Sequence, residues 1–390
     1  MKKKLLFING HLNTGGVEKA LIDVLRHIDY ERLDVDLLLL EGLGDYAPLL
    51  PKQVRVIERP LQNTYGSLFC ALSRCVREGD RFGLKMRLIF LGMKLFGLKN
   101  IRLARKLLLG NAYYDCAVGF RPGICTQIAA FAADADRRIT WWHHGKINVP
   151  RSDYLEAALA CDAVAVVSDS CRAMLAKEFP ELADKMVTVH NMLDTDEILR
   201  RTEPDPYSDK SVRHIVSVGR LSPEKHFDNA IRAAKALKDR GIPFCWYLVG
   251  DGPLRPELER LAQELEVTDC FRFEGNQPNP YPYFRHADLF VHPSYVESFG
   301  IVVLEAMTLG VPCVVTRSLG PAEFIAHEKN GLLTEQSPDS LTEAVLRILE
   351  NRDLYHAIKK NTHCPDKYLP ENVIKKIEGL LSDEDQEVDL

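Results

Sequence analysis

The sequence predicts an α/β protein made of two Rossmann-like, doubly wound domains. Short apolar runs alternate with helical patterns in both halves of the chain, as in repeated βαβ units. The chain has 390 residues, which is more than one hydrophobic core usually holds. A polar stretch with two prolines, residues 195–211, separates the two series. We therefore expect an N-terminal domain at 1–194, a linker at 195–211 and a C-terminal domain at 212–369.

Composition excludes several classes of protein. The formal net charge is -5, so nothing global indicates a nucleic-acid partner. The ten cysteines include no Cys-x-x-Cys pair, which argues against a zinc site and a disulfide framework. No apolar run reaches the length of a membrane span, and the lysines at residues 2–4 lead into a strand-like run instead of a signal peptide. We expect a cytoplasmic protein.

The expected strands are the largely apolar runs of four to seven residues. In the N-terminal domain they lie at 4–9, 34–40, 54–57, 114–118, 139–143 and 163–167. In the C-terminal domain they lie at 214–218, 244–249, 288–292 and 311–315, with helices at 338–350 and 371–381. Residues 383–390 are acidic and are expected to form a disordered tail.

The stretch from His292 to Gly310 predicts an anion site. A strand ends at His292, and a helix is expected from Phe299 to Gly310. The first turn of that helix would contain Ser298, Phe299, Gly300 and Ile301. Its N–H groups have no partner inside the helix and the helix dipole is positive there, so the turn favours an anion. Gly300 would let a phosphate approach the backbone closely.

Two glutamates flank this turn, Glu297 before it and Glu305 within the helix. An ionised carboxylate only accepts hydrogen bonds, so sugar hydroxyl groups are its natural partners beside a phosphate. The stretch therefore predicts a site for a diphosphate flanked by two sugars. The alternative is an ordinary capped helix with two unrelated acids.

Further cations and glycines follow other expected strands. Arg220 and Lys225, in the segment Gly219-Arg-Leu-Ser-Pro-Glu-Lys, place two cations at a strand end, as a diphosphate requires. Gly15 and Gly16 follow the first strand and suit a tight turn near a ligand, although a plain turn is the alternative. This loop is neither a P-loop nor a dinucleotide fingerprint.

Two histidines end the strand at 139–143. His143 and His144 lie at the carboxyl edge of an open parallel sheet, which is where such sheets bind ligands. A single histidine is more often structural, but two at one strand end favour a functional interpretation.

Together, Glu297-x7-Glu305 with Ser-Phe-Gly between, the Gly219–Lys225 segment and the Gly15–Gly16 loop resemble the donor site of GT4-type (glycosyltransferase group 1) retaining glycosyltransferases of GT-B fold. The resemblance covers most of the chain. It implies two domains that face each other across a cleft, with the last helix, 370–382, crossing back to the N-terminal domain. Leu319 departs from the family's Gly-Gly-x-x-Glu turn by replacing one glycine.

The resemblance also implies roles for single residues. Arg220 and Lys225 would contact the donor phosphates, Glu305 the ribose, Glu297 the transferred sugar, and His144, or else His143, the donor sugar or the acceptor. The catalytic residues implied are Arg220, Lys225, Glu297 and His144. The residues implied for binding the donor are Gly15, Gly16, Gly219, Ser298, Phe299, Gly300, Ile301, Glu305 and Asn276.

The implied reaction moves a hexose from a nucleotide-diphosphosugar, for which we expect a UDP-sugar, to an acceptor hydroxyl with retention of configuration. We expect a lipid-linked saccharide of cell-surface polysaccharide synthesis as acceptor. No Asp-x-Asp pattern lies at a strand end, so no metal or other cofactor is expected. A nucleotide-sugar epimerase of similar fold and a non-catalytic nucleotide-sugar-binding subunit are the alternatives.

The segment 74–106 predicts contact with a membrane. It carries ten Lys and Arg residues and only two acids, Glu78 and Asp80, interleaved with large apolar residues at helical spacing. This pattern is typical of an amphipathic helix pair at an anionic membrane surface. We therefore expect a peripheral protein on the inner membrane face. The alternative is a pair of ordinary surface helices packed on the sheet.

Overall fold

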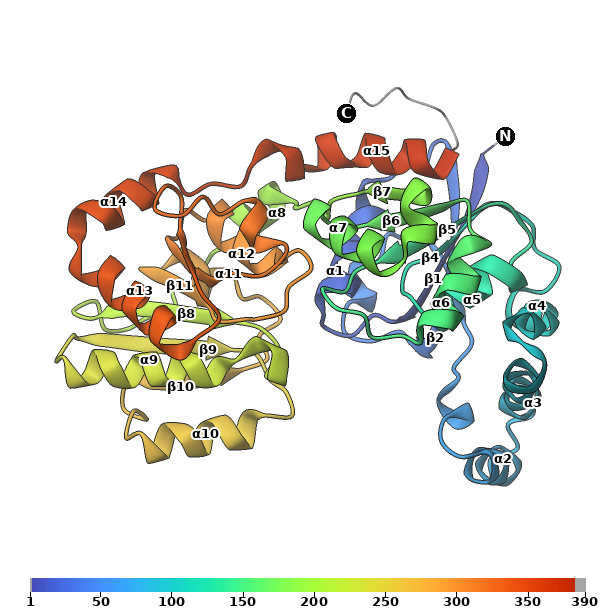
Figure 1. Cartoon of the computed structure of the whole chain (residues 1–390), viewed down its shortest axis with the longest axis horizontal. Helices are drawn as coiled ribbons and strands as arrows, with labels where there is room; N and C mark the ends of the chain where they lie inside the picture. Colours follow the sequence, from blue (N-terminus) through green and yellow to red (C-terminus); the bar gives the residue numbers. More distant parts are fainter. Residues whose placement is uncertain (1, 383–390) are drawn as a thin grey trace. The chain divides into compact units, whose positions relative to one another are not determined.

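The computed structural model describes residues 2–382 and divides the chain into two compact units (Figure 1). Unit 1 contains the described residues up to Met192 together with those from Pro370 onward. Unit 2 contains Leu193–Leu369. Each unit is built around one parallel sheet with helices on its faces, which confirms the predicted α/β class and the two doubly wound domains.

Unit 1 has a seven-stranded sheet in the order β3-β2-β1-β4-β5-β6-β7, and every pairing is parallel. The chain reverses its direction of winding between β1 and β4, as in the dinucleotide-binding folds. The strands are β1 (Lys3–His11), β2 (Leu33–Gly42), β3 (Arg55–Glu58), β4 (Tyr114–Gly119), β5 (Ala135–Trp142), β6 (Ala163–Val166) and β7 (Met186–Thr188).

The helices of unit 1 cover both faces of this sheet. They are α1 (Gly16–His27), α2 (Leu68–Arg77), α3 (Arg81–Phe96), α4 (Arg105–Leu109), α5 (Ile124–Gln127), α6 (Arg151–Leu159), α7 (Asp169–Glu178) and α15 (Pro370–Ser382). Helix α3 packs on the sheet through Met86 and Ile89, which share a buried cluster with Leu6 and Leu38. Helices α2, α3 and α4 form a row beside the sheet (Figure 1).

Helix α15 completes unit 1 although it comes last in the chain. The backbone N–H of Asp29 donates to Glu378 Oε1 at 3.0 Å, and Arg137 Nε donates to the Leu380 carbonyl at 2.9 Å. Val373, Ile377, Leu380 and Leu381 are buried. The sequence expectation of an acidic tail at 383–390 lies outside the described residues.

Unit 2 has a six-stranded parallel sheet in the order β10-β9-β8-β11-β12-β13. The strands are β8 (Arg213–Val218), β9 (Phe244–Val249), β10 (Phe271–Gly275), β11 (Leu289–His292), β12 (Cys313–Thr316) and β13 (Leu332–Thr334). The helices are α8 (Thr195–Arg200), α9 (Phe227–Asp239), α10 (Arg255–Glu264), α11 (Tyr281–Arg285), α12 (Ile301–Thr308), α13 (Pro338–Glu350) and α14 (Arg352–Asn361).

The expected linker at 195–211 belongs to unit 2. Its first part forms α8, which contacts α12. Its second part is anchored by Tyr207, which is buried, stacks on His214 with ring centroids 4.2 Å apart, and donates to the Tyr283 carbonyl at 2.6 Å. The stretch is polar in composition, but one buried aromatic side chain is enough to fix it on the sheet.

Candidate functional site

Two loops of unit 2 meet at the carboxyl ends of β8 and β11, which are neighbours in the sheet. One carries Arg220 and Lys225, and the other carries Glu297. The backbone N–H of Tyr295 donates to the Glu224 carbonyl at 3.1 Å, and the rings of His226 and Tyr295 stack with centroids 3.7 Å apart. These contacts hold the basic loop against the acidic one.

Lys225, Glu297 and His292 form a buried cluster at this edge. The Lys225 ammonium contacts Glu297 Oε1, and His292 Nε2 lies 2.7 Å from the same oxygen. The exposed fractions of the three side chains are 19%, 12% and 0%. Both contacts use Oε1, so the second carboxylate oxygen retains its capacity to accept a hydrogen bond from a ligand hydroxyl.

The protonation states of this cluster follow from burial and charge. Burial acts to raise the pKa of Glu297, but the Lys225 ammonium and the His292 ring outweigh it and hold that pKa well below its usual range. Burial lowers the pKa of His292, and Glu297 offsets part of that shift. At neutral pH His292 is therefore uncharged and Glu297 is ionised, so His292 Nε2 carries the proton that it donates to the carboxylate.

The sequence expected Lys225 to face phosphates and Glu297 to face a sugar. The structure brings the two side chains together, although they are 72 residues apart in sequence. A lysine ammonium has three N–H donors, so contact with Glu297 leaves donors for a phosphate oxygen. Arg220 lies exposed at the start of the same loop.

The loop before α12 differs from its predicted form. Helix α12 begins at Ile301, two residues later than expected, because Gly300 is left-handed at φ 89° and ψ 49°. A Cβ on Gly300 would lie 2.9 Å from Pro321 Cγ, and one on Gly320 would lie 2.3 Å from Phe299 Cα. Gly300 thus packs against the Pro321 ring and Gly320 against the Phe299 backbone, at distances that only glycine permits.

Phe299 contributes its backbone alone to this loop. Its side chain is buried and meets the Tyr368 ring edge-on, with centroids 5.2 Å apart. The Val303 N–H already donates to the Gly300 carbonyl at 2.9 Å. An anion at this helix start would therefore use N–H groups that precede Val303, in the segment 298–302.

The remaining donor-side residues lie along the same edge of the sheet. Glu305 is buried, and the Tyr281 hydroxyl donates to its Oε1 at 3.2 Å, which orients the carboxylate. Gly219 follows β8 and packs closely against Gly250. A Cβ on Gly250 would lie 2.0 Å from the Gly219 carbonyl oxygen. Asn276 is exposed directly after β10. Tyr281, Tyr295 and His292 are structural partners that the motif pattern did not single out.

In unit 1, the Gly15–Gly16 loop is firmly held. Gly15 precedes α1, and its carbonyl accepts from the Lys19 N–H at 2.9 Å. The Thr14 N–H and hydroxyl donate to Asp45 Oδ2 at 3.0 and 2.9 Å. Helix α1 thus begins at the carboxyl edge of the unit 1 sheet, and a ligand contact at its first turn stays a prediction.

A charged cluster beside this loop was missed by the sequence reasoning. Glu18 is buried and its Oε1 lies 3.1 Å from Arg121 NH2 and 3.8 Å from His11 Nδ1. His11 Nε2 lies 3.9 Å from Glu41 Oε2. These residues come from the ends of β1, β2 and β4 and from α1. An acid two residues after the paired glycines was the one sequence signal that could have indicated the cluster.

The two histidines after β5 have different surroundings. His143 is buried, with ring centroids 4.5 Å from Phe120 and 5.8 Å from Trp141, and burial lowers its pKa well below the usual value. His144 is partly exposed; burial, with Arg121 and Lys146, lowers its pKa to about 4. Both rings are therefore neutral at pH 7, and His144 is the one with surface for a ligand.

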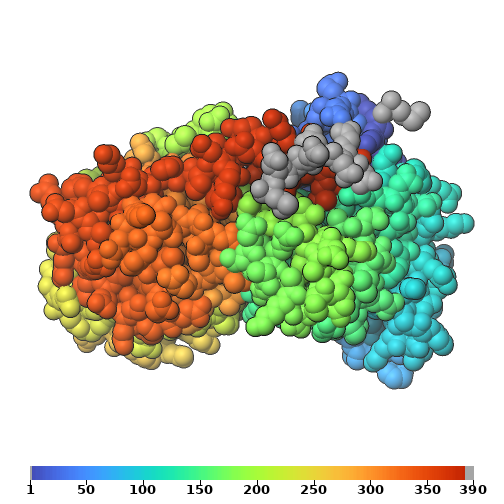
Figure 2. Space-filling model, turned by 45° about the horizontal axis from the view of Figure 1, so that its top comes forward, coloured from blue at the N-terminus to red at the C-terminus, as the bar shows by residue number. Residues whose placement is uncertain are grey.

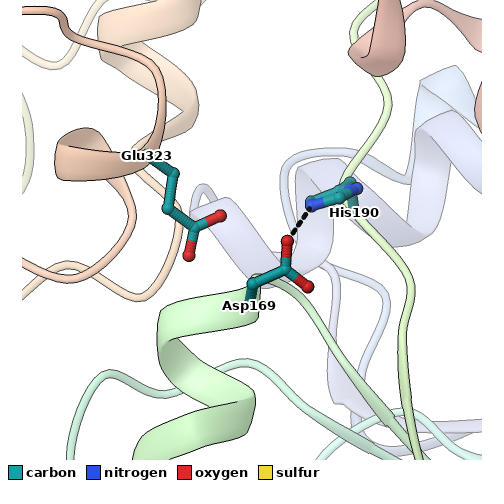
Figure 3. A group of neighbouring side chains, drawn as sticks. All are labelled: Asp169, His190 and Glu323. Carbon is teal, nitrogen blue, oxygen red and sulfur yellow. Dashed lines mark ion pairs between the residues drawn. The ribbon is translucent and has the colours of Figure 1, made fainter. Parts of the chain in front are cut away.

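Asp169 stands at the start of α7, and its Oδ2 lies 3.8 Å from His190 Nε2 (Figure 3). Both residues belong to unit 1. Glu323, also drawn in Figure 3, belongs to unit 2 and lies in the short 3₁₀ helix Pro321–Glu323. The expectation that no metal takes part stays a prediction.

The two doubly wound sheets place the chain in the class of GT-B glycosyltransferase folds. Several solved structures match over nearly the whole chain, among them the following two. Anabaena Alr3699/HepE in complex with UDP has a TM-score of 0.68 at 18% identity and covers 97% of this chain and 100% of its own. WaaG, a glycosyltransferase involved in lipopolysaccharide biosynthesis, has a TM-score of 0.65 at 18% identity and covers 96% of this chain and 100% of its own. At this identity the likeness shows the fold alone.

The family model of glycosyl transferases group 1 matches residues 201–363, so the resemblance to group 1 glycosyltransferases is confirmed for unit 2. A lipopolysaccharide core biosynthesis glycosyltransferase, LpsD of Rhizobium meliloti, is 36% identical over 137 residues, 35% of this chain and 39% of the relative. A GDP-mannose-dependent phosphatidylinositol dimannoside mannosyltransferase of Mycobacterium tuberculosis is 35% identical over 135 residues, 35% of each chain. The chain thus spans less than two fifths of the length of these two relatives.

Proposed function

We propose that this protein is a retaining hexosyltransferase that moves a sugar from a UDP-sugar to a hydroxyl of a lipid-linked saccharide. The observation that carries the proposal is the cluster of Lys225, Glu297 and His292 beside the start of α12, in the unit that matches group 1 glycosyltransferases. It presents a cation, an ionised carboxylate and a helix N-terminus within one loop system. Those are the groups that a diphosphosugar requires.

The leaving group of the reaction is a nucleoside diphosphate, whose negative charge grows as the bond to the sugar breaks. Arg220, Lys225 and the N–H groups at the start of α12 would stabilise this charge from fixed positions. Glu297 Oε2 would accept a hydrogen bond from a hydroxyl of the transferred sugar, and Glu305 would accept hydrogen bonds from the ribose.

In the proposed step, the bond between the sugar C1 and the phosphate oxygen breaks while the acceptor oxygen bonds to C1 on the same face. The acceptor proton passes to a phosphate oxygen of the leaving group. No protein base is then needed, and neutral His144 would bind the donor sugar or acceptor by hydrogen bonds. The three groups of unit 2 would supply the charge stabilisation, so we propose that the reaction needs no metal.

Names of similar proteins support the choice of substrates. HepE, which shares the fold, is described in complex with UDP-glucose, in keeping with a UDP-sugar donor, whereas the mycobacterial relative is named as GDP-mannose-dependent, so the donor panel includes both nucleotides. LpsD acts in lipopolysaccharide core biosynthesis, and the mycobacterial relative is named for a phosphatidylinositol dimannoside. Both names point to saccharides joined to lipids, which supports a lipid-linked acceptor for this chain.

The basic helices of unit 1 support a peripheral membrane location. Seven of the ten cations between residues 74 and 106 are exposed: Arg77, Arg81, Lys85, Lys94, Lys99, Arg102 and Lys106. Six large apolar side chains are exposed on the same elements: Phe69, Val76, Leu88, Leu95, Phe96 and Leu103. The segment forms part of the outer surface of unit 1, as the cyan atoms of Figure 2 show. We call this exposed set the basic apolar face.

The energetics of this face suit reversible attachment. Each cation near an anionic leaflet contributes about 1 kcal/mol, so four or five of the seven would give roughly 4–5 kcal/mol before ordering costs. Phe69 and Phe96 are 84% and 78% exposed and could insert between headgroups. Among residues 2–382, no helix has the length and apolar character to cross a bilayer. We propose that the enzyme works on the inner membrane face, in cell-surface polysaccharide synthesis.

The test is nucleotide release from a panel of nucleotide-diphosphosugars, with and without a bacterial lipid extract as acceptor. A transferase releases nucleoside diphosphate faster when the extract is present, and a glycosylated lipid appears in mass spectra. Interconversion of two donor sugars without an acceptor would instead indicate an epimerase. Donor binding in calorimetry with no turnover on any extract would indicate a non-catalytic binding subunit.

A further inference from the structure

Unit 1 contains a cavity of about 500 Å³ beyond the carboxyl end of β3, in the size range of small-ligand pockets. Its polar lining comes from the segment after β3 and from the start of α3: Glu58, Arg59, Gln62, Asn63 and Asp80. Phe82 and Leu107 form an apolar part of the wall. None of these residues belongs to the donor site in unit 2 or to the charged cluster around Glu18.

The polar groups of this cavity are held in place by the backbone. Asp80 caps α3, because its Oδ1 accepts from the Gly83 N–H at 2.7 Å, and its Oδ2 accepts from Asn63 Nδ2 at 3.0 Å. Arg59 Nε donates to the Leu107 carbonyl at 3.1 Å, and its NH1 donates to the Glu58 carbonyl at 2.9 Å. These bonds fix the carboxylate and the guanidinium before any ligand arrives.

The charge of the lining excludes anionic ligands, and its hydrogen-bonding groups indicate which ligand would fit. Two carboxylates and one guanidinium give the cavity a net charge of -1, which opposes a phosphate or another anion. Carboxylate and amide oxygens accept hydrogen bonds from hydroxyl groups, and the guanidinium and amide N–H groups donate to ring and hydroxyl oxygens. Phe82 and Leu107 offer an apolar wall for the C–H face of a ring. This combination fits a neutral, polyhydroxylated ring.

We propose that this cavity binds a neutral sugar ring of the acceptor. The assignment to the acceptor rests on the proposed transferase function, whereas the sugar-binding chemistry does not. Gln62 links the cavity to the carboxyl edge of the sheet, because its Nε2 donates to the Glu41 carbonyl at the end of β2. The lining also includes Phe82 of α3, and on this helix Arg81, Lys85 and Leu88 of the basic apolar face are exposed. A sugar held here can therefore carry a lipid that lies at the membrane.

The first test measures binding to the whole chain in the absence of any nucleotide sugar. Saturation-transfer NMR with the methyl glycosides of glucose, galactose and mannose should give signals for at least one of them, with methyl glucosaminide as a cationic comparison. Asp80→Asn removes the charge but keeps an N-cap residue, so α3 should persist. It should weaken binding about tenfold, the scale of one charge-assisted hydrogen bond. Glu78→Gln, an exposed acid of the same segment outside the cavity, should leave binding unchanged.

The second test separates this proposal from the transferase proposal. Slow donor hydrolysis in water should be equal in the wild type and Asp80→Asn, while KM for the lipid acceptor should rise about tenfold with kcat retained. A chain that binds methyl glycosides but transfers no sugar refutes the transferase and keeps the sugar site. No signal from any glycoside, equal binding by Asp80→Asn, or a preference for the glucosaminide would each overturn the neutral-sugar site.

Discussion

Removing the Lys225 ammonium tests the electrostatics of the candidate donor site. We expect Lys225→Met to destabilise unit 2 because Glu297 stays ionised and buried with only His292 as partner. Removing one partner of a fully buried pair costs about 3–5 kcal/mol. The side chains of Lys225 and Glu297 are 19% and 12% exposed, so we expect a loss below that range, about 2–3 kcal/mol.

The double variant Lys225→Met/Glu297→Gln separates the pair from general packing. It removes both charges, and a glutamine can still accept from His292, so the combined loss should be smaller than the sum of the single losses by about 1–2 kcal/mol. Hydrogen exchange of peptides from unit 2 measures the stability of this unit by itself. Additive losses in that cycle would refute the inferred coupling between Lys225 and Glu297.

The same single variant, Lys225→Met, should change the titration of His292. Burial and Lys225 lower the pKa of this ring and Glu297 raises it, so loss of the ammonium should raise the pKa. The depressed pKa of Glu297 contributes stability that is present above the unfolded carboxyl value of about 4.3 and is lost as pH falls through the folded value. In Lys225→Met this acid-side dependence should shrink. An unchanged His292 titration, followed by NMR with His292→Asn for assignment, would contradict the inferred effect of the ammonium on the ring.

Further predictions concern turnover, nucleotide binding, metal and membrane. Arg220→Ala should lower turnover about 10²–10³-fold, the scale of one lost stabilising group, and near-normal turnover would remove Arg220 from the mechanism. Glu305→Gln should weaken nucleoside diphosphate binding in calorimetry, and an unchanged affinity would exclude the ribose contact. Activity should survive EDTA; loss that Mg²⁺ or Mn²⁺ restores would show that a metal is needed. Charge reversal at Arg81, Lys85 and Lys94 should abolish sedimentation with anionic liposomes at low salt while slow donor hydrolysis in solution continues. Equal sedimentation with neutral and anionic vesicles would instead indicate that these are ordinary surface helices packed on the sheet.

Most of the strands could be predicted because parallel strands buried on both faces are continuous apolar runs, whereas the expected runs of four to seven residues did not include β7, β10 and β13. The run at 244–249 matches β9 residue for residue, and the helix expected at 338–350 matches α13. The start of α12 could not be placed by the same means. Its position depends on the left-handed Gly300, and apolar periodicity continues through Phe299 whether or not the helix does.

Only part of the candidate site could be predicted, because a sequence shows which residues share a loop but not which loops meet. Residue types within one loop, such as Arg220 with Lys225, are visible in the sequence. The contact of Lys225 with Glu297 spans two loops, and the contacts of Glu18 with Arg121 and of His11 with Glu41 need the strand order of the sheet. Phe299 also shows that a residue inside a functional motif can serve the core with its side chain.

The late position of α15 has a consequence for biosynthesis. Unit 2 is an insertion between two parts of unit 1, so every residue of unit 2 leaves the ribosome before α15 does. Until then Asp29 and Arg137 lack their α15 partners and the apolar surface under Val373 and Ile377 is open to solvent. The first domain to begin synthesis is therefore the last to be completed, and during translation this apolar surface of unit 1 is accessible to chaperones and proteases.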